Sequence, residues 1–139
     1  SAWRAARGLG AKPIAGCLPV SGTYRFGAGS GLSMRPRFLG PVDDGRAERA
    51  AGPLAQLEAA ACPPFLVGWG GRDFPHLARQ AEEMVAALRA AGVHVETDVL
   101  AGCDHFEASL ACGDEAWAAR AAAWMRQRGA ARPSTGDLR

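Results

Sequence analysis

The central third of this sequence alternates short apolar runs with one long amphipathic run, and this pattern restricts the fold more than any other feature. Phe65–Trp69 and Val93–Leu100 have the length and composition of strands. Between them, Pro75–Ala91 repeats apolar side chains three and four positions apart, as a helix packed on one side does. Pro75 suits the first helical turn, and Gly92 suits the position after the last. A strand, a helix and a strand of these lengths predict a crossover between parallel strands.

The helix and the second strand are each expected to bury one side. The apolar positions of the helix are Leu77, Ala81, Met84, Val85 and Leu88. In the second strand, Val93, Val95, Thr97 and Val99 alternate with His94, Glu96 and Asp98. This period of two predicts a strand near a sheet edge, with its valine side buried and its charged side in water.

The segments before this unit predict one further strand and an irregular excursion. Pro13–Ser21 is a short apolar run typical of a buried parallel strand, although Pro19 has no N–H for the ladder. Gly22–Gly52 is rich in Gly and Pro and predicts loops and short helical turns, the place where a cap over a site would be inserted. Ala2–Leu9 predicts the end of a helix, and Leu54–Ala61 predicts a short one.

A last helix is predicted from about Asp114, its cap, to Arg126. Its expected buried side consists of Trp117, Ala121, Trp124 and Met125. The whole order predicts an α/β fold, a parallel sheet with helical crossovers. We expect residues 1–128 to belong to one domain, with 22–52 as a loop or cap excursion, and residues 129–139 to form a mobile tail.

Charge and composition exclude several classes of partner. The net charge is only +2, and Lys12 and the arginines are interspersed with acidic residues, which argues against nucleic acid. No apolar stretch approaches the ~20 residues of a membrane span, so no membrane partner is expected. The N-terminus lacks an apolar signal-peptide core, and the four cysteines form no CxxC pair. These features predict a reduced, cytoplasmic setting.

Asp73 and His105 follow the ends of the two central strands, in the motifs GGRDFP and GCDHF. The carboxyl ends of neighbouring parallel strands meet at one edge of a sheet, so we expect the two side chains to lie on adjacent loops. A carboxylate that orients a histidine is the acid and base pair of acyl transfer. The order nucleophile, acid, histidine is that of α/β-hydrolases.

Plainer interpretations of these residues remain open at this point. Asp73 could instead cap the helix that begins at Pro75. His76 and His94 are interpreted as surface residues without a role. Cys103 and Cys112 lie near His105 in the sequence and suggest a thiol nucleophile or a metal site, but no third metal ligand has a suitable spacing. We expect no metal ion and no cofactor.

The run from PPFLVGWGGRDFPHLARQ to VLAGCDHFEASL resembles the C-terminal half of α/β-hydrolases of the kynurenine formamidase and carboxylesterase type. The resemblance covers roughly Pro13 to Met125. It implies a partial α/β-hydrolase fold, with Asp73 as triad acid and His105 as triad base. It also implies that the Gly-x-Ser-x-Gly elbow and the oxyanion loop should come before residue 1, because the opening helix would match the helix after the elbow.

No serine in the sequence satisfies the elbow pattern. Ser30 lies in GAGSGLS with its glycines out of register, and Ser33 has Arg35 two positions later. Ser21 has Pro19 and Thr23 at the elbow positions, and in the resembled family this Ser-Gly segment is not the nucleophile. Ser1, acting through its own amine, is a chemical possibility that the α/β order does not favour.

Two functions of different class follow. The first is a serine hydrolase acting on a carboxylic ester or N-formyl aryl amide, with only trace activity in this chain alone. Its expected substrate pocket consists of Tyr24, Trp69, Phe74 and Phe106, which could equally be core residues. The second is a non-catalytic α/β remnant that acts as a binding or dimerisation module. In either case an open sheet edge would favour self-association or pairing with an N-terminal segment.

Overall fold

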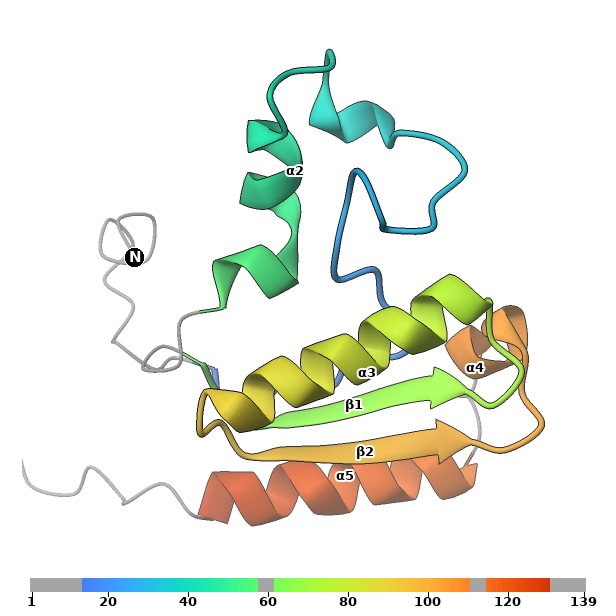
Figure 1. The fold of residues 1–139 in the computed structure, drawn as a ribbon. Helices are drawn as coiled ribbons and strands as arrows, with labels where there is room; N and C mark the ends of the chain where they lie inside the picture. The colour runs from blue at the N-terminus through green and yellow to red at the C-terminus, as the bar shows by residue number, and fades with distance from the viewer. Residues whose placement is uncertain (1–13, 58–61, 111–114, 131–139) are drawn as a thin grey trace, which may run out of the picture.

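The computed structural model describes residues 14–57, 62–110 and 115–130. Its centre is a small parallel sheet of β1 (Phe65–Gly70) and β2 (Val95–Leu100), joined by α3 (Pro75–Ala90). Phe65 pairs with Val95 at one end of the sheet, and Gly70 pairs with Leu100 at the other. The predicted α/β crossover is therefore present, with both strands pointing to the same edge (Figure 1).

The segment before the excursion joins this sheet only at isolated points, so the regular strand predicted for Pro13–Ser21 is wrong. Cys17 and Val20 form single parallel bridges with Phe65 and Gly68. The Cys17 N–H donates to the Pro64 carbonyl over 2.9 Å, but Pro19 can only accept, from the Gly68 N–H at 2.9 Å. The missing proline N–H interrupts the ladder where the next bond would form. Pro13 itself lies outside the described residues.

The helix α3 packs on one face of the sheet and forms the core. All five apolar positions predicted for this helix are buried, and Ala81 and Leu88 are fully so, at 0% exposure. Four of the five belong to one core cluster with Val67 and Trp69 of β1, namely Ala81, Met84, Val85 and Leu88. Each buried Leu or Val side chain contributes roughly 1.5–3 kcal/mol, so this contact holds helix and sheet together.

The other face of the sheet is covered by α5 (Glu115–Ala130), which corrects the prediction that the charged side of β2 faces water. Glu96 accepts hydrogen bonds from Trp124 Nε1 at 2.9 Å and from Arg128 at 2.5 Å. Asp98 pairs with Arg120 at 2.7 Å. Cations on the helix thus compensate the strand's carboxylates, whereas Val99 on the predicted buried side is 51% exposed.

The last helix also differs in extent and orientation from its prediction. It continues to Ala130, so residues 129 and 130 of the predicted tail are helical. Ala121 and Trp124 are buried, but Met125 is half exposed. The expected cap Asp114, the predicted helix Ala2–Leu9 and residues 131–139 lie outside the described residues.

The excursion 22–52 consists of loops and short helices, as predicted, and stands above α3 (Figure 1). Its helices are a 3₁₀ turn at Arg37–Leu39 and α2 (Arg46–Ala51). A second 3₁₀ turn, Pro53–Gln56, takes the place of the helix predicted for Leu54–Ala61, whose residues 58–61 lie outside the described part. The turn begins at Pro53 and ends at Gln56, because the next residue, Leu57, has an extended backbone.

A buried glutamine on α3 anchors the excursion, and sequence reasoning missed it. Gln80 is 1% exposed. Its Oε1 accepts from the backbone N–H groups of Tyr24 at 2.8 Å and Arg25 at 2.7 Å. Its Nε2 donates to the Ser30 carbonyl over 2.6 Å. One side chain therefore satisfies three backbone groups that burial would otherwise leave unpaired.

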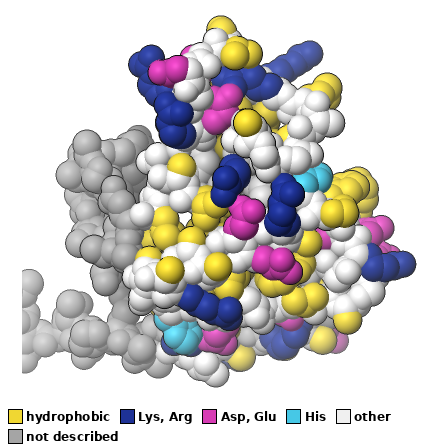
Figure 2. Space-filling view, viewed as in Figure 1, with side chains coloured by type: hydrophobic (Ala, Val, Ile, Leu, Met, Phe, Trp, Pro, Cys, Tyr) yellow, Lys and Arg dark blue, Asp and Glu magenta, His cyan; other side chains and the backbone are white. Residues whose placement is uncertain are grey.

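The surface has mixed charge. Figure 2 shows arginine and acidic side chains interspersed over the excursion and α3, with apolar side chains between them. None of the helices in the described ranges is both long and apolar enough to cross a bilayer.

Candidate active site

The loops after β1 and β2 lie against each other at the carboxyl edge of the sheet (Figure 1). The Gly71 N–H donates to the Leu100 carbonyl and the Arg72 N–H to the Cys103 carbonyl, each over 2.9 Å. The Arg72 guanidinium adds a bond of 2.7 Å to the Gly102 carbonyl. These bonds fix the loop that carries Asp73 relative to the loop that precedes His105.

Asp73 and His105 come together at this edge. His105 Nδ1 and Asp73 Oδ1 are 3.1 Å apart. The Asp73 side chain is fully buried, whereas the His105 side chain is 26% exposed. The predicted proximity of the two residues is therefore confirmed, and the histidine lies on the accessible side of the pair.

Four donors converge on the Asp73 carboxylate. Oδ1 also accepts from the Phe74 N–H at 2.7 Å, and Oδ2 accepts from the Ser21 hydroxyl at 2.5 Å and, more weakly, from the Gly70 N–H at 3.4 Å. Burial raises the pKa of the Asp73 carboxyl, but the hydrogen bonds from Ser21, Phe74 and Gly70 and the charge of His105 outweigh it. The pKa of Asp73 consequently lies below its ordinary value, which keeps the group ionised.

The alternative interpretation of Asp73 as a helix cap does not fit this geometry. The cap position of α3 is occupied by Phe74, and no side chain caps the helix N-terminus. Asp73 accepts the Phe74 N–H, which lies before the first helical residue. The carboxylate is thus directed at His105 and Ser21, away from the free N–H groups of the helix.

His105 is the first residue of α4 (His105–Leu110), a short helix that was not predicted. Asp104 Oδ1 accepts from the N–H groups of Phe106 and Glu107 at 2.9 Å, and Glu107 Oε2 accepts from the Asp104 N–H at 2.8 Å. This reciprocal pair is a capping box. Its signature, Asp104-x-x-Glu107, was the sequence signal that could have revealed the helix and the fixed placement of His105.

The hydrogen bond to Asp73 also determines what the imidazole can do. An ionised carboxylate only accepts, so neutral His105 carries its proton on Nδ1 and has its lone pair on Nε2. Within the described part of the chain, Nε2 has no hydrogen-bond partner. The geometry leaves this nitrogen available to take a proton from a group outside the pair.

Aromatic rings surround the imidazole. The centroid of Phe74 lies 5.1 Å from that of His105, and Phe106 lies 5.5 Å from it. The His76 ring stacks on Phe74, with 5.8 Å between the ring centroids. Phe74 and Phe106 are 46% and 67% exposed, so they form an accessible apolar surface beside the His105 ring.

The other two expected pocket residues lie elsewhere. Tyr24 and Trp69 belong to the core cluster under α3, at 4% and 9% exposure. Burial raises the pKa of the Tyr24 phenol. The side chains of Tyr24 and Trp69 therefore pack the fold, which is the commoner place for aromatic residues next to a strand.

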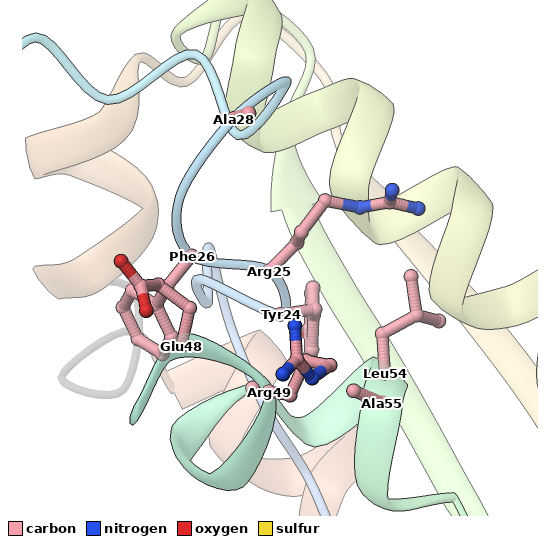
Figure 3. A pocket seen from close by; sticks show the side chains of 9 residues that line it. Tyr24, Arg25, Phe26, Ala28, Glu48, Arg49, Leu54 and Ala55 are labelled. Atoms are coloured by element: carbon pink, nitrogen blue, oxygen red, sulfur yellow. The ribbon is translucent and has the colours of Figure 1, made fainter. Parts of the chain in front are cut away.

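Tyr24 also borders a separate cavity of about 330 Å³ within the excursion (Figure 3). Arg25, Glu48 and Leu54 are among the other residues that line it. Arg25 pairs with Glu83 at 3.0 Å, and Glu48 forms an ion pair with Arg35. Neither Asp73 nor His105 lines this cavity, so it is distinct from the acid and base pair.

The cysteines do not gather into a metal site in the described ranges. Cys103 is a free thiol, and Cys112 lies outside these ranges. No three His, Cys, Asp or Glu side chains of residues 14–57, 62–110 and 115–130 are grouped as metal ligands would be.

A comparison with known protein families finds none that matches this chain, and a comparison with curated proteins finds no match either.

Proposed function

We propose that Asp73 and His105 are the acid and base of an acyl-transfer hydrolase of the α/β-hydrolase type. One observation carries the proposal: a buried, ionised carboxylate holds Nδ1 of a histidine whose side chain is partly exposed and whose Nε2 has no hydrogen-bond partner among the described residues. This is the arrangement that a general base requires, because the carboxylate fixes the tautomer and stabilises the imidazolium.

In the proposed reaction, His105 Nε2 removes the proton of a hydroxyl as its oxygen attacks the substrate carbonyl. Asp73 compensates the positive charge that forms on the ring. The imidazolium then returns the proton to the leaving group, and a second cycle with water releases the acid. None of the described residues places a hydroxyl on Nε2, so the proposal assigns the nucleophile to a segment outside them. The resemblance to α/β-hydrolases assigns it to an upstream elbow.

The proposed substrate is a carboxylic ester or an N-formyl aryl amide. The exposed rings of Phe74 and Phe106 support this choice, since they lie where an apolar acyl or aryl group would approach His105. Tyr24 and Trp69 play no part in the proposal, because they are core residues.

The proposal can be tested on the 139-residue chain with p-nitrophenyl acetate, an ester activated enough to react with a histidine directly. We expect slow hydrolysis that is lost in His105→Gln and reduced in Asp73→Asn. His94→Gln is the control, because His94 contacts Glu96 and Arg128 and not Asp73. Equal rates for the wild type and His105→Gln would overturn the proposal and favour the non-catalytic binding or dimerisation module.

The rate should also remain at trace level. Loss of a nucleophile lowers the catalytic rate by far more than the loss of one oxyanion donor, which lowers it by about 10²–10³-fold. Robust turnover of esters or N-formyl aryl amides by the 139-residue chain would contradict the assignment of the nucleophile to another segment.

A further inference from the structure

Ser21 makes the shortest contact of the Asp73 carboxylate, and the proposed reaction does not yet use it. The Ser21 hydroxyl donates to Asp73 Oδ2 over 2.5 Å, from a position 8% exposed. The residues are 52 positions apart in the sequence. A hydrogen bond between a hydroxyl and an ionised, buried carboxylate belongs to the strong class.

The backbone of Ser21 adopts an unfavourable conformation to make this contact. Its φ is +48°, and it is the single non-glycine residue with positive φ in the described ranges. The left-handed region is unfavourable for an L-residue, because its Cβ crowds the neighbouring carbonyl oxygen. The Ser21 N–H nevertheless donates to the Gly68 carbonyl of β1 at 2.9 Å, which holds the residue in place. Glycine would adopt this conformation without cost, so the serine side chain needs a reason to be there.

The contacts of Asp73 supply that reason. Oδ1 faces His105 Nδ1 at 3.1 Å, while Oδ2 faces Ser21. A carboxylate with both oxygens bonded cannot rotate about its Cβ–Cγ bond without breaking one of these contacts. We propose that Ser21 is a positioning residue, whose hydroxyl holds the Asp73 carboxylate in the orientation that presents Oδ1 to His105. The catalytic part of this role rests on the proposed function.

The test uses Ser21→Gly and Ser21→Ala. The glycine variant removes the hydroxyl and also the strain, so it is expected to fold; the alanine variant removes only the hydroxyl. Ser33→Ala is the matched control, because Ser33 is exposed and lies outside the site. Three readouts are compared: titration of the Asp73 carboxyl carbon by NMR, the deshielded proton on His105 Nδ1, and the hydrolysis of p-nitrophenyl acetate.

If Ser21 positions Asp73, both variants raise the pH at which Asp73 titrates and weaken the Nδ1 proton signal. The ester rate is expected to fall about tenfold, the factor that corresponds to the lower end of the range for a hydrogen bond to a charged group. If Ser21 only shapes the turn, Ser21→Gly leaves all three readouts as in the wild type, and the inference is overturned.

The outcomes separate this inference from the proposed function. If His105→Gln loses the ester rate while Ser21→Gly matches the wild type in all three readouts, only the role of Ser21 is overturned. An ester rate independent of His105 would overturn the proposed function, while a shifted Asp73 titration in Ser21→Gly would still support the positioning contact.

Discussion

Gly70 is the position where one methyl group should disturb the site most. It ends β1, and a Cβ at this residue would lie 2.4 Å from the Cys103 carbonyl oxygen and 2.9 Å from that of Asp104. Both atoms belong to the backbone of the loop that leads into His105. We expect Gly70→Ala to push this loop away from β1 and to separate His105 from Asp73.

The size of the effect follows from the distances. An ordinary contact needs 3.4 Å, so the loop must move by about 1 Å from the 2.4 Å contact. Overpacking of this kind typically costs 1–3 kcal/mol, and here the rigid backbone on both sides favours about 2–3 kcal/mol. A shift of about 1 Å at a catalytic group can lower a rate by roughly 10²-fold. The ester rate of Gly70→Ala should therefore fall to that of His105→Gln.

Gly71→Ala is the matched control. The nearest atoms to a Cβ at Gly71 are at 3.5 Å, an ordinary contact, and its φ is not in the left-handed region. In urea unfolding, the stability of this variant should lie within about 0.5 kcal/mol of the wild type. Its rate of p-nitrophenyl acetate hydrolysis should be unchanged. Equal stability and equal rates for Gly70→Ala and Gly71→Ala would refute the predicted close approach between β1 and the His105 loop.

Four further predictions follow from the described contacts. Because the fold lowers the pKa of Asp73, ionised Asp73 contributes stability above the ordinary carboxyl pKa and loses it as the pH falls through the lowered value. The wild type should exceed Asp73→Asn in unfolding free energy by a constant amount near neutral pH and by less at acid pH. A difference that grows in acid would contradict a lowered pKa of Asp73. Gln80→Leu leaves three backbone groups of the excursion unpaired, so it should lower the free energy of unfolding in urea by about 2–4 kcal/mol and speed proteolysis of residues 22–52. The control is Glu82→Gln at an exposed position, which should change neither quantity. Gly16→Ala would bring a methyl group to 2.5 Å from the Trp124 ring and should cost about 1–3 kcal/mol; an unchanged melting temperature would argue against the packing of α5 on this face. Cys17, Pro19 and Ser21 direct their ladder bonds to β1, so the backbone groups between them face away from β1. We expect this open edge to pair with a second copy of the chain, and light scattering should detect the self-association. A monodisperse monomer would contradict this prediction.

The central crossover could be predicted from the sequence because its signals are local. The apolar period of Pro75–Ala91 and the flanking strands are patterns of consecutive residues, and they identify α3, β1 and β2 with errors of only one or two positions. Asp73 and His105 could be placed together for a general reason, since parallel strands end at one edge of a sheet. Their catalytic role remains a proposal.

Features that depend on distant partners could not be predicted. The sequence predicts that Glu96 and Asp98 face solvent, because charged residues on a strand usually do, yet arginines on α5, more than twenty residues away, compensate them. The hydrogen bond from His94, with those from Arg128 and Trp124, lowers the pKa of Glu96. Gln80 is similar, because its partners Tyr24 and Ser30 lie fifty or more positions earlier in the chain.

Ser21 illustrates a second limit. A serine before a glycine at the end of an apolar run is typical of an ordinary turn. Only its φ of +48° and its bond of 2.5 Å to Asp73 distinguish it, and both depend on the packed fold. The short helix α4 is different, because its capping box, Asp104-x-x-Glu107, is a local signal that the sequence contains.

The central claim is that His105 activates a hydroxyl nucleophile with the help of Asp73. The most direct test is to label the protein expressed from its complete open reading frame with a fluorophosphonate, which reacts preferentially with an activated serine, and to map the label by mass spectrometry. The account predicts a labelled serine in a Gly-x-Ser-x-Gly sequence upstream of Ser1, with labelling lost in His105→Gln and retained in His94→Gln. No labelling, or labelling that persists in His105→Gln, would contradict it.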